Sequence, residues 1–333
     1  MNSPQLSRAA LSTWMAAAAV AAFPTWEEWR FRLQPGEPEI RACFGGSMET
    51  SPLDPLRGDL DVLLRDVTAA AVPVLLVVVV FIACLGHKSA RQEGRRAAGA
   101  LALIAVLEPA VPAYGLPDPD DCGMITMLSP EWFATVLGSW GATQFCLLGA
   151  AALVLLAARI TGIATAQRPA AGVTWRRVAA LLVDYVILVV ALPFVVALVL
   201  LVTGLDGSPS FATNWGLVNA MCVSPVSMDP DRLIALPMVL AYFWAQHSRQ
   251  GWTLGKWLLR IRLAGAGEAK PGVGRVALRT LVFPGAVFVP VVGPFVLVID
   301  VLWTFLDPDG RTLHDRLART VVTPRVPSVK PLG

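Results

Sequence analysis

The sequence predicts an all-α membrane protein, a polytopic bundle of about six transmembrane helices followed by a C-terminal helical hairpin. Three observations predict this fold. Hydrophobic residues make up 55% of the 333 residues and charged residues only 15%, a departure from soluble proteins toward those of the bilayer. Apolar stretches of membrane-spanning length recur along the chain. Arginine and lysine gather between alternate stretches, as they do in proteins inserted with a fixed orientation.

The predicted spans follow from the length of helix that a bilayer needs. About 20 mostly apolar residues cross the hydrocarbon core as a helix, and lipid offers the backbone no hydrogen-bond partner. The first candidate, residues 9–23, is short and rich in alanine. Its Ala-Val-Ala at 19–21 also suits signal peptidase, so a retained anchor and a cleaved signal over residues 1–22 both stay open. Five further spans are predicted, at residues 69–86, 97–116, 132–158, 178–203 and 233–247.

The last apolar stretch, residues 276–306, is too long for one crossing. As a single helix of 31 residues it would be about 46 Å long, against a hydrocarbon core of about 30 Å. Pro290, Gly293 and Pro294 interrupt it, because proline has no amide hydrogen for the helical ladder and glycine permits a tight turn. We therefore expect a hairpin of two short helices that enters and leaves the membrane on the same side.

The positions of the basic residues test this topology independently, since lysine and arginine are retained on the cytoplasmic side during insertion. With both termini inside, the inside segments hold 21 of the 27 basic residues and the outside segments hold 6. A single crossing at 276–306 would export a basic tail, so the charge pattern favours the hairpin. Arginine outnumbers lysine by 23 to 4, which indicates a GC-rich bacterial genome. We expect a multi-pass protein of the bacterial plasma membrane with both termini cytoplasmic.

The cysteines agree with this topology. Cys43, Cys122 and Cys222 fall one in each of the three predicted outside loops. An oxidising exterior permits one disulfide between two of them, and the sequence does not select the pair. Cys84 and Cys146 fall within predicted spans and are interpreted as packing residues.

Three short blocks in the C-terminal half combine charged residues and glycines in a distinctive order. The first, WRRVAALLVDY at residues 175–185, places Arg177 and Asp184 on one stripe of a helix. The second is GWTLGK at 251–256, and the third is IDVLWTFLDPDGRTLHDRLARTVV at 299–322. The candidate site residues of these blocks are Arg177, Asp184, Asp300, His314 and Asp315, and the loop motif contains Gly251, Thr253, Gly255 and Lys256.

In this order the three blocks resemble the RDD family of integral membrane proteins. The resemblance implies an RDD membrane domain over residues 171–325, preceded by an accessory membrane region at 1–170 with up to four helices and an outside loop at 24–68. Residues 326–333 are expected to form a cytoplasmic tail. The family is named for one arginine and two aspartates, and transport has been suggested for it. The resemblance identifies Arg177 as the arginine, Asp184 as the first aspartate, and Asp300 and Asp315 as the acidic positions of the closing block.

Asp184 and Asp300 are expected at one depth, about 10 Å below the cytoplasmic interface, because each lies seven residues from a charge at that interface. A carboxylate there costs on the order of 2.5–3.5 kcal/mol unless it faces protein or water. One interpretation is a paired-carboxylate or cation site open to the cytoplasm, with Arg177 and Arg279 as counter-charges. The other is a structural ion pair that holds helices together.

Two segments on the outside have open interpretations. A Glu-Pro pair begins at Glu108, near the outer end of the 97–116 span, where a broken helix can line an ion pathway. The alternative is a helix that ends at the outer interface. The outside segment 24–68, with Trp26 and Trp29, is interpreted as a small cap or a partner-binding loop, because it is too short for a sizeable domain.

The cytoplasmic motifs are interpreted as interface anchors. The 251–256 loop lacks the spacing of a phosphate loop, so nucleotide binding is not predicted. Trp252 and Trp257 are expected to seat this loop in the interface while Lys256 faces lipid head groups with Arg260 and Arg262. The His-Asp pair at 314–315 is expected to cap or anchor an amphipathic helix at the inner leaflet.

Composition argues against several classes of function. The net charge of +3 is small, and no basic run is interleaved with aromatic residues, so no nucleic-acid partner is expected. The three histidines, His87, His247 and His314, lie in separate segments. We therefore predict no metal site, no cofactor and no enzymatic activity.

Two functions are compatible with these observations. The first is a small-solute or cation transporter, proton-linked, that uses Asp184 and Asp300 near a cytoplasm-facing cavity. The second is a non-transporting membrane scaffold or assembly factor that binds a partner through its outside loops. The expected partners are the lipid bilayer, a small cation or solute in the first case, and a second copy or another protein in the second.

Overall fold

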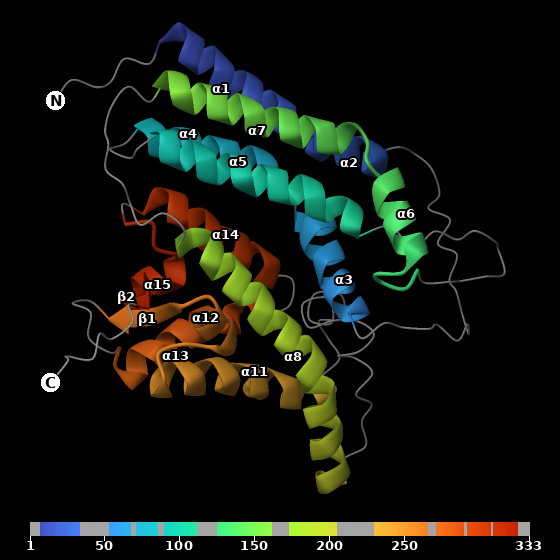
Figure 1. Ribbon diagram of the computed structural model, residues 1–333, viewed down its shortest axis with the longest axis vertical. Helices are drawn as coiled ribbons and strands as arrows, with labels where there is room; N and C mark the ends of the chain where they lie inside the picture. The colour runs from blue at the N-terminus through green and yellow to red at the C-terminus, as the bar shows by residue number, and fades with distance from the viewer. Residues whose placement is uncertain are drawn as a thin grey trace, which may run out of the picture. The chain divides into compact units, whose positions relative to one another are not determined.

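The computed structural model describes residues 7–33, 53–67, 71–85, 90–111, 125–161, 173–204, 230–265, 271–289, 292–307 and 309–325. These residues are predominantly helical (Figure 1), which confirms the all-α fold class. The chain forms two compact units. The first comprises residues 1–167 together with 214–219 and 305–310, and the second comprises the rest of residues 168–333. Cys43, Cys122, Cys222, Pro290 and the tail 326–333 lie outside the described residues.

The first unit contains seven α-helices in its described residues, which Figure 1 labels in chain order. They are α1 (Arg8–Ala21), α2 (Phe23–Leu33), α3 (Asp54–Asp61), α4 (Val72–Leu85), α5 (Ala90–Leu107), α6 (Pro130–Gly138) and α7 (Ala142–Thr161). A π-helical turn at Val62–Val67 extends α3, and a 3-10 turn at Glu108–Ala110 ends α5. Ser7 and Ser129 cap α1 and α6, each accepting a backbone hydrogen bond of 3.1 Å.

Small side chains let the helices of the first unit approach closely. Helix α7 packs against α5 and α1, and buried alanines dominate the contact faces: Ala10, Ala17, Ala21, Ala97, Ala98, Ala105, Ala150, Ala151, Ala157 and Ala158. At the tightest point, a Cβ on Gly94 would overlap the Cβ of Ala158. Faces of small residues are typical of helices that associate within a bilayer.

The second unit begins with the longest helix described. This unit comprises α8 (Val173–Thr203), α11 (Pro230–Arg249), α12 (Leu254–Leu258), β1 (Ile261–Gly265), α13 (Val273–Val282), the 3-10 turn η3 (Gly285–Phe288), α14 (Gly293–Leu306), α15 (Leu313–Leu317) and β2 (Thr320–Pro324). At about 1.5 Å per residue, the 31 residues of α8 extend about 46 Å. This helix is therefore longer than the hydrocarbon core needs.

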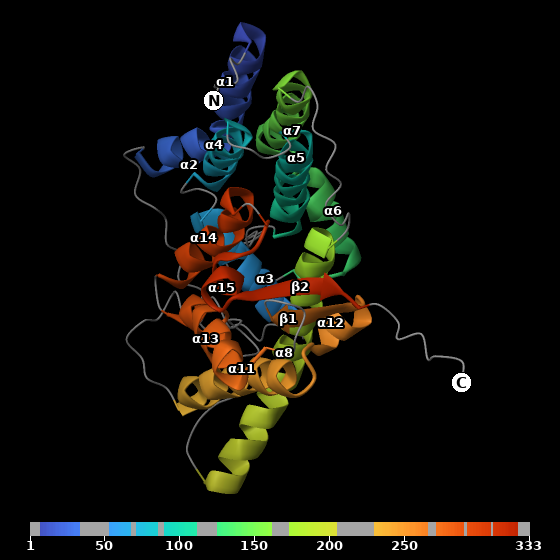
Figure 2. The same cartoon turned by 90° about the vertical axis from the view of Figure 1, so that its left-hand side faces the viewer.

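A two-stranded antiparallel ribbon is the feature of this unit that the sequence analysis did not predict. Strand β1 pairs with β2 from Ile261 opposite Pro324 to Gly265 opposite Thr320, and the two lie side by side in Figure 2. Burial alternates at the start of β1, where Ile261 and Leu263 are buried and Arg262 between them is exposed, and both faces are covered from Leu263 onward, since Ala264 is also buried.

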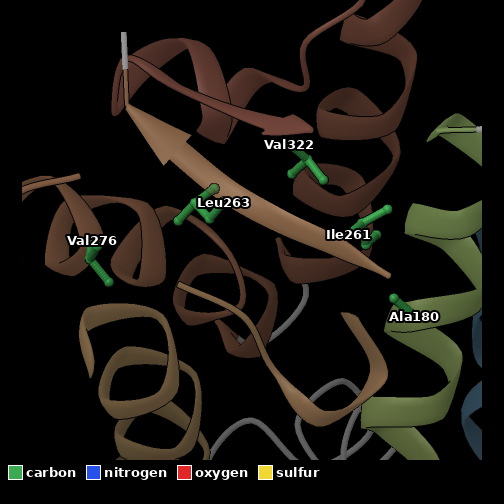
Figure 3. Packing of buried hydrophobic residues seen from close by; sticks show 5 residues of the cluster. All are labelled: Ala180, Ile261, Leu263, Val276 and Val322. Carbon is green, nitrogen blue, oxygen red and sulfur yellow. The ribbon is translucent and has the colours of Figure 1, made fainter. Parts of the chain in front are cut away.

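The ribbon closes a small apolar core in the second unit. Ala180 from α8, Ile261 and Leu263 from β1, Val276 from α13 and Val322 from β2 are each at most 5% exposed and form one cluster. Figure 3 shows these five side chains between the ribbon and the helices that flank it. The cluster fixes the second and third sequence blocks against the first turns of α8.

Two long apolar stretches are each interrupted, so that neither forms a single helix. Residues 276–306 form the end of α13, the turn η3 and the helix α14, as the proline and glycine residues predict. The backbone closes tightly there, because a Cβ on Gly293 would overlap the carbonyl oxygen of Val287. The predicted span 132–158 is divided into α6 and α7 at residues 139–141. The prediction of one helix over 132–158 was wrong. Gly138 and Gly141 flank the break, and glycine destabilises the interior of a helix.

Within the described residues, two helices are long and apolar enough to cross a membrane, at Ala142–Thr161 and Trp175–Thr203. Val72–Leu85 and Gly293–Leu306 are shorter apolar helices. The 14 residues of α4 extend about 21 Å, and α5 begins at Ala90, within the predicted cytoplasmic loop, so it includes charged residues. The count of six spans and the hairpin topology therefore stay predictions.

Candidate functional site

Asp184 lies on α8 at the centre of a buried hydrogen-bonded cluster. Its carboxylate is 1% exposed and accepts three hydrogen bonds, from Tyr242 Oη at 2.9 Å, Thr253 Oγ1 at 2.5 Å and the backbone N–H of Gly255 at 2.8 Å. All three donors are neutral. Asp184 therefore joins α8 to α11 and to the 251–256 loop, and none of these three hydrogen bonds comes from a cation.

The local structure explains the residue types in the GWTLGK block. Gly251 has a φ of +76°, a left-handed conformation that favours glycine. Thr253 caps α12 by accepting from the backbone N–H of Lys256 at 3.4 Å while it donates to Asp184. A Cβ on Gly255 would overlap the carbonyl oxygen of Ala180 on α8. The two glycines and the threonine thus allow the loop to lie directly against α8.

Lys256 is buried beneath this loop. Its Nζ lies 2.6 Å from His247 Nε2, and His247 Nδ1 lies 2.7 Å from the carbonyl oxygen of Phe243. Because a carbonyl only accepts, Nδ1 carries the ring hydrogen and Nε2 accepts from Lys256. Burial, followed by the positive charge of Arg279, lowers the pKa of Lys256 well below its ordinary value. The expectation that Lys256 faces lipid head groups was wrong, because the loop folds inward.

Asp300 on α14 holds the start of α15. It accepts from the backbone N–H of His314 at 2.8 Å and from His314 Nδ1 at 2.7 Å. His314 Nε2 lies 2.8 Å from Arg279 Nη2, and arginine only donates, so His314 is a neutral ring with its hydrogen on Nδ1. Burial and the charge of Arg279 lower the pKa of His314, in agreement with this assignment. Phe283 stacks on the His314 ring at 5.0 Å.

Asp315 is the acidic residue that pairs with arginine. Its carboxylate lies 3.0 Å from Arg279 Nε and 3.5 Å from Arg177 Nη1, and it accepts from Thr320 Oγ1 at 3.1 Å. Burial alone would raise the pKa of Asp315, but the positive charges of Arg279 and Arg177 outweigh burial and hold the pKa well below its ordinary value. Asp315 is therefore ionised and paired.

Arg177 has a different partner from the one expected. It pairs with Asp315 and donates to the carbonyl oxygen of Val322 on β2 at 3.3 Å, whereas the sequence analysis proposed it as a counter-charge for Asp184 and Asp300. The reason is the ribbon, which brings the closing block against the first turns of α8. Among the described residues, no hydrogen bond joins Asp184 to Asp300.

The structure thus gathers the sequence-predicted residues into two anchors. The first, centred on Asp184, contains Gly251, Thr253, Gly255 and Lys256. The second is a chain of contacts through Asp300, His314, Arg279, Asp315 and Arg177. Sequence reasoning missed Tyr242 and His247 as members, although both are polar residues near the cytoplasmic end of an apolar helix, which is the signal that could have found them.

The remaining predicted residue, Glu108, lies elsewhere. Helix α5 ends at Leu107, and Glu108 begins the 3-10 turn, a geometry that agrees with a helix end. Its carboxylate accepts from Gln144 Nε2 at 3.3 Å. Within the residues that the structure describes, no group of three or more His, Cys, Asp or Glu side chains is placed to hold a metal ion.

The apolar helices and the buried polar cluster in the second unit define a helical membrane-associated domain. Residues 171–319 match the family model of the RDD family. The C-terminal half of the chain is therefore an RDD domain, which confirms the resemblance of the three sequence blocks. No curated protein and no solved structure matches the chain.

Proposed function

We propose that the protein is a non-transporting membrane scaffold or assembly factor, in which the RDD charges hold helices and loops in one fixed arrangement. The observation that supports this proposal is the burial of Asp184, which is 1% exposed and accepts hydrogen bonds from Tyr242, Thr253 and Gly255. A bound cation would have to exchange with one of these donors or open the packing around them. The cost of that exchange favours a structural role for the carboxylate.

The second anchor supports the same function. Asp300 accepts both the backbone and the ring hydrogen of His314, and Asp315 is occupied by Arg279, Arg177 and Thr320. The three acidic residues each have at most 2% of their surface exposed. Buried polar networks of this kind favour one packing arrangement.

We place the partner-binding surface in the outside segment 24–68. Trp26 and Trp29 on α2 are 55% and 52% exposed, and tryptophan is enriched among the residues that dominate protein interfaces. In this proposal the protein lies in a bacterial plasma membrane with both termini cytoplasmic, and it has no enzymatic activity and no cofactor.

A flux measurement tests the proposal. The full-length protein and its Asp184→Asn variant are reconstituted into phospholipid vesicles, and proton, sodium and potassium fluxes are followed under imposed gradients. We expect neither protein to exceed the leak of empty vesicles. Flux in the parent protein that disappears in a folded Asp184→Asn variant would overturn the scaffold role and establish transport.

Proton-linked transport of a small cation or solute is the second candidate, and one observation favours it. Lys256 and His247 form a buried contact at 2.6 Å between two titratable groups, and protonation of the pair would repel the nearby Arg279. A proton could in this way change the packing of the 251–256 loop. The candidate requires proton-driven flux in the parent protein and its loss in Lys256→Met.

A further inference from the structure

A basic hollow in the first unit lies apart from the RDD charges. It has a volume of about 470 Å³ and is lined by Arg91 and Arg95 of α5 and by Leu155 and Arg159 of α7. This volume is within the range of about 300–1,000 Å³ that small-molecule sites occupy. Three arginines thus converge on one space from two neighbouring helices.

The packing of α5 against α7 creates this convergence. Gly94 lies against Ala158, with no room for a Cβ, so the residues beside these two positions are brought together. Arg91 and Arg95 are four residues apart and share one face of α5. Arg159 lies in the last turn of α7, and the first turn of α5 contributes the positive end of a helix dipole.

The arginines of the hollow form no ion pair with a carboxylate in the described part of the chain. Glu93, on the same turn of α5, is buried and bound to Arg96 at 3.1 Å. No carboxylate of the described residues forms an ion pair with Arg91, Arg95 or Arg159. Like charges four residues apart on a helix repel each other, so an anion in the hollow would stabilise the fold.

We propose that Arg91, Arg95 and Arg159 form a binding site for a phosphate ester, the anionic head group of a phospholipid or a soluble phosphate. Guanidinium groups bind phosphate oxygens through paired N–H donors. Leu155 lies one helical turn from Arg159, deeper along α7, and gives the hollow an apolar side. A polar rim beside an apolar side suits a phospholipid, whose charged head group adjoins its acyl chains. The charge pattern of the sequence predicts that these arginines lie at the cytoplasmic interface of the membrane, where such head groups are found.

Lipid binding to the full-length protein tests this site. The protein is purified in detergent, stripped of lipid, and titrated with phosphatidylglycerol or phosphatidylcholine, with bound lipid counted by native mass spectrometry. We expect phosphatidylglycerol to bind more tightly than phosphatidylcholine. The triple variant Arg91→Gln/Arg95→Gln/Arg159→Gln is expected to weaken phosphatidylglycerol binding roughly 100-fold, from about 1 kcal/mol per basic residue.

A control variant separates a defined site from diffuse attraction by basic residues. Arg260→Gln/Arg262→Gln/Arg275→Gln removes the same charge from exposed arginines that the topology places on the same membrane face. Arg260 and Arg262 are expected at the head-group level, so they measure diffuse attraction by basic residues, and this control should weaken phosphatidylglycerol binding much less than the triple variant of the hollow. Equal loss in the two triple variants would overturn the proposal, and equal binding of the two lipids would exclude a phospholipid head group as the ligand.

Two further measurements keep the test decisive. Leu155→Trp retains every charge and fills the hollow, so it should also weaken binding; retention of full affinity in this variant contradicts the site. Inorganic phosphate and glycerol 3-phosphate are titrated without lipid, with the thermal midpoint as readout. Stabilisation by these compounds identifies a soluble phosphate as the ligand, and stabilisation by phosphatidylglycerol alone identifies a lipid head group. The absence of both effects rejects the site.

Discussion

Arg177 pairs with Asp315, the acidic residue of the closing block, at 3.5 Å. It does so in place of Asp184, which lies seven residues further along its own helix. The pair ties the first turn of α8 to α15, and the Val322 carbonyl on β2 accepts a second bond from the same guanidinium. The three aspartates thus have different partners in this domain. Asp315 holds the arginines, while Asp184 and Asp300 hold backbone and neutral side chains.

Asp315→Asn should be among the most destabilising single substitutions in the second unit. It removes the charge that Arg279 and Arg177 share, and loss of one partner of a buried ion pair costs about 3–5 kcal/mol. Because the pKa of Asp315 is held well below its ordinary value, its contribution is present above about pH 4 and is lost as the pH falls further.

The thermal midpoint of the purified protein in detergent, followed by circular dichroism, measures this effect. The deficit of Asp315→Asn relative to the parent should stay constant from pH 5 to pH 8. Glu131→Gln, at an exposed position of α6, is the control and should have a midpoint close to the parent. A small deficit at Asp315 would show that the arginines do not need this carboxylate.

Gly255→Ala should destabilise the protein through a single methyl group. The added Cβ would overlap the backbone oxygen of Ala180, and overpacking of this kind costs about 1–3 kcal/mol. Gly274→Ala is the control, because a Cβ there meets nothing within 4 Å. We expect its thermal midpoint to be unchanged or slightly raised, since alanine favours helix over glycine. Equal midpoints for the two variants would argue against the close contact of the loop with α8.

The positions of most helices and the identity of the important charges could be predicted from the sequence. Apolar runs are a strong signal for helices in a membrane protein, and Gly293 begins α14 after the break that follows α13. Helix ends were harder, because apolarity does not record where backbone hydrogen bonds stop. Helix α5 begins at Ala90, within a charged segment that composition assigns to a loop.

The partners of the charges could not be predicted, because they depend on contacts between distant segments. Arg177 reaches Asp315 only after β1 pairs with β2, and five-residue strands give a weak signal beside long apolar helices. Lys256 has the sequence context of a surface lysine, yet the loop turns it toward His247. Its burial depends on Gly251 and Gly255, whose conformations only the folded chain defines.

Mild acid should destabilise the second anchor through His314. The pKa of His314 is lowered in the folded protein, so its contribution to stability is present above about pH 6.5 and is lost as the pH falls toward the folded value. The loss is at most about 1.4 kcal/mol per pH unit. In His314→Gln the decrease of the thermal midpoint between pH 7.5 and pH 5.5 should be smaller than in the parent. An unchanged decrease would assign the pH dependence to other groups.

Lys256 should stabilise the protein more in alkaline than in neutral solution. Its pKa is lowered well below 10.5 by burial and by Arg279, so its contribution is present above about pH 10.5 and is lost as the pH falls through the folded value. Lys256→Met carries no titratable group, and the gain in thermal midpoint between pH 7 and pH 9 should be smaller in this variant than in the parent. Lys256→Arg is the matched comparison, because arginine keeps its charge throughout this range and should be the least stable of the three proteins. A Lys256→Arg variant as stable as the parent would mean that the buried side chain is already charged, and the neutral contact with His247 would then be wrong.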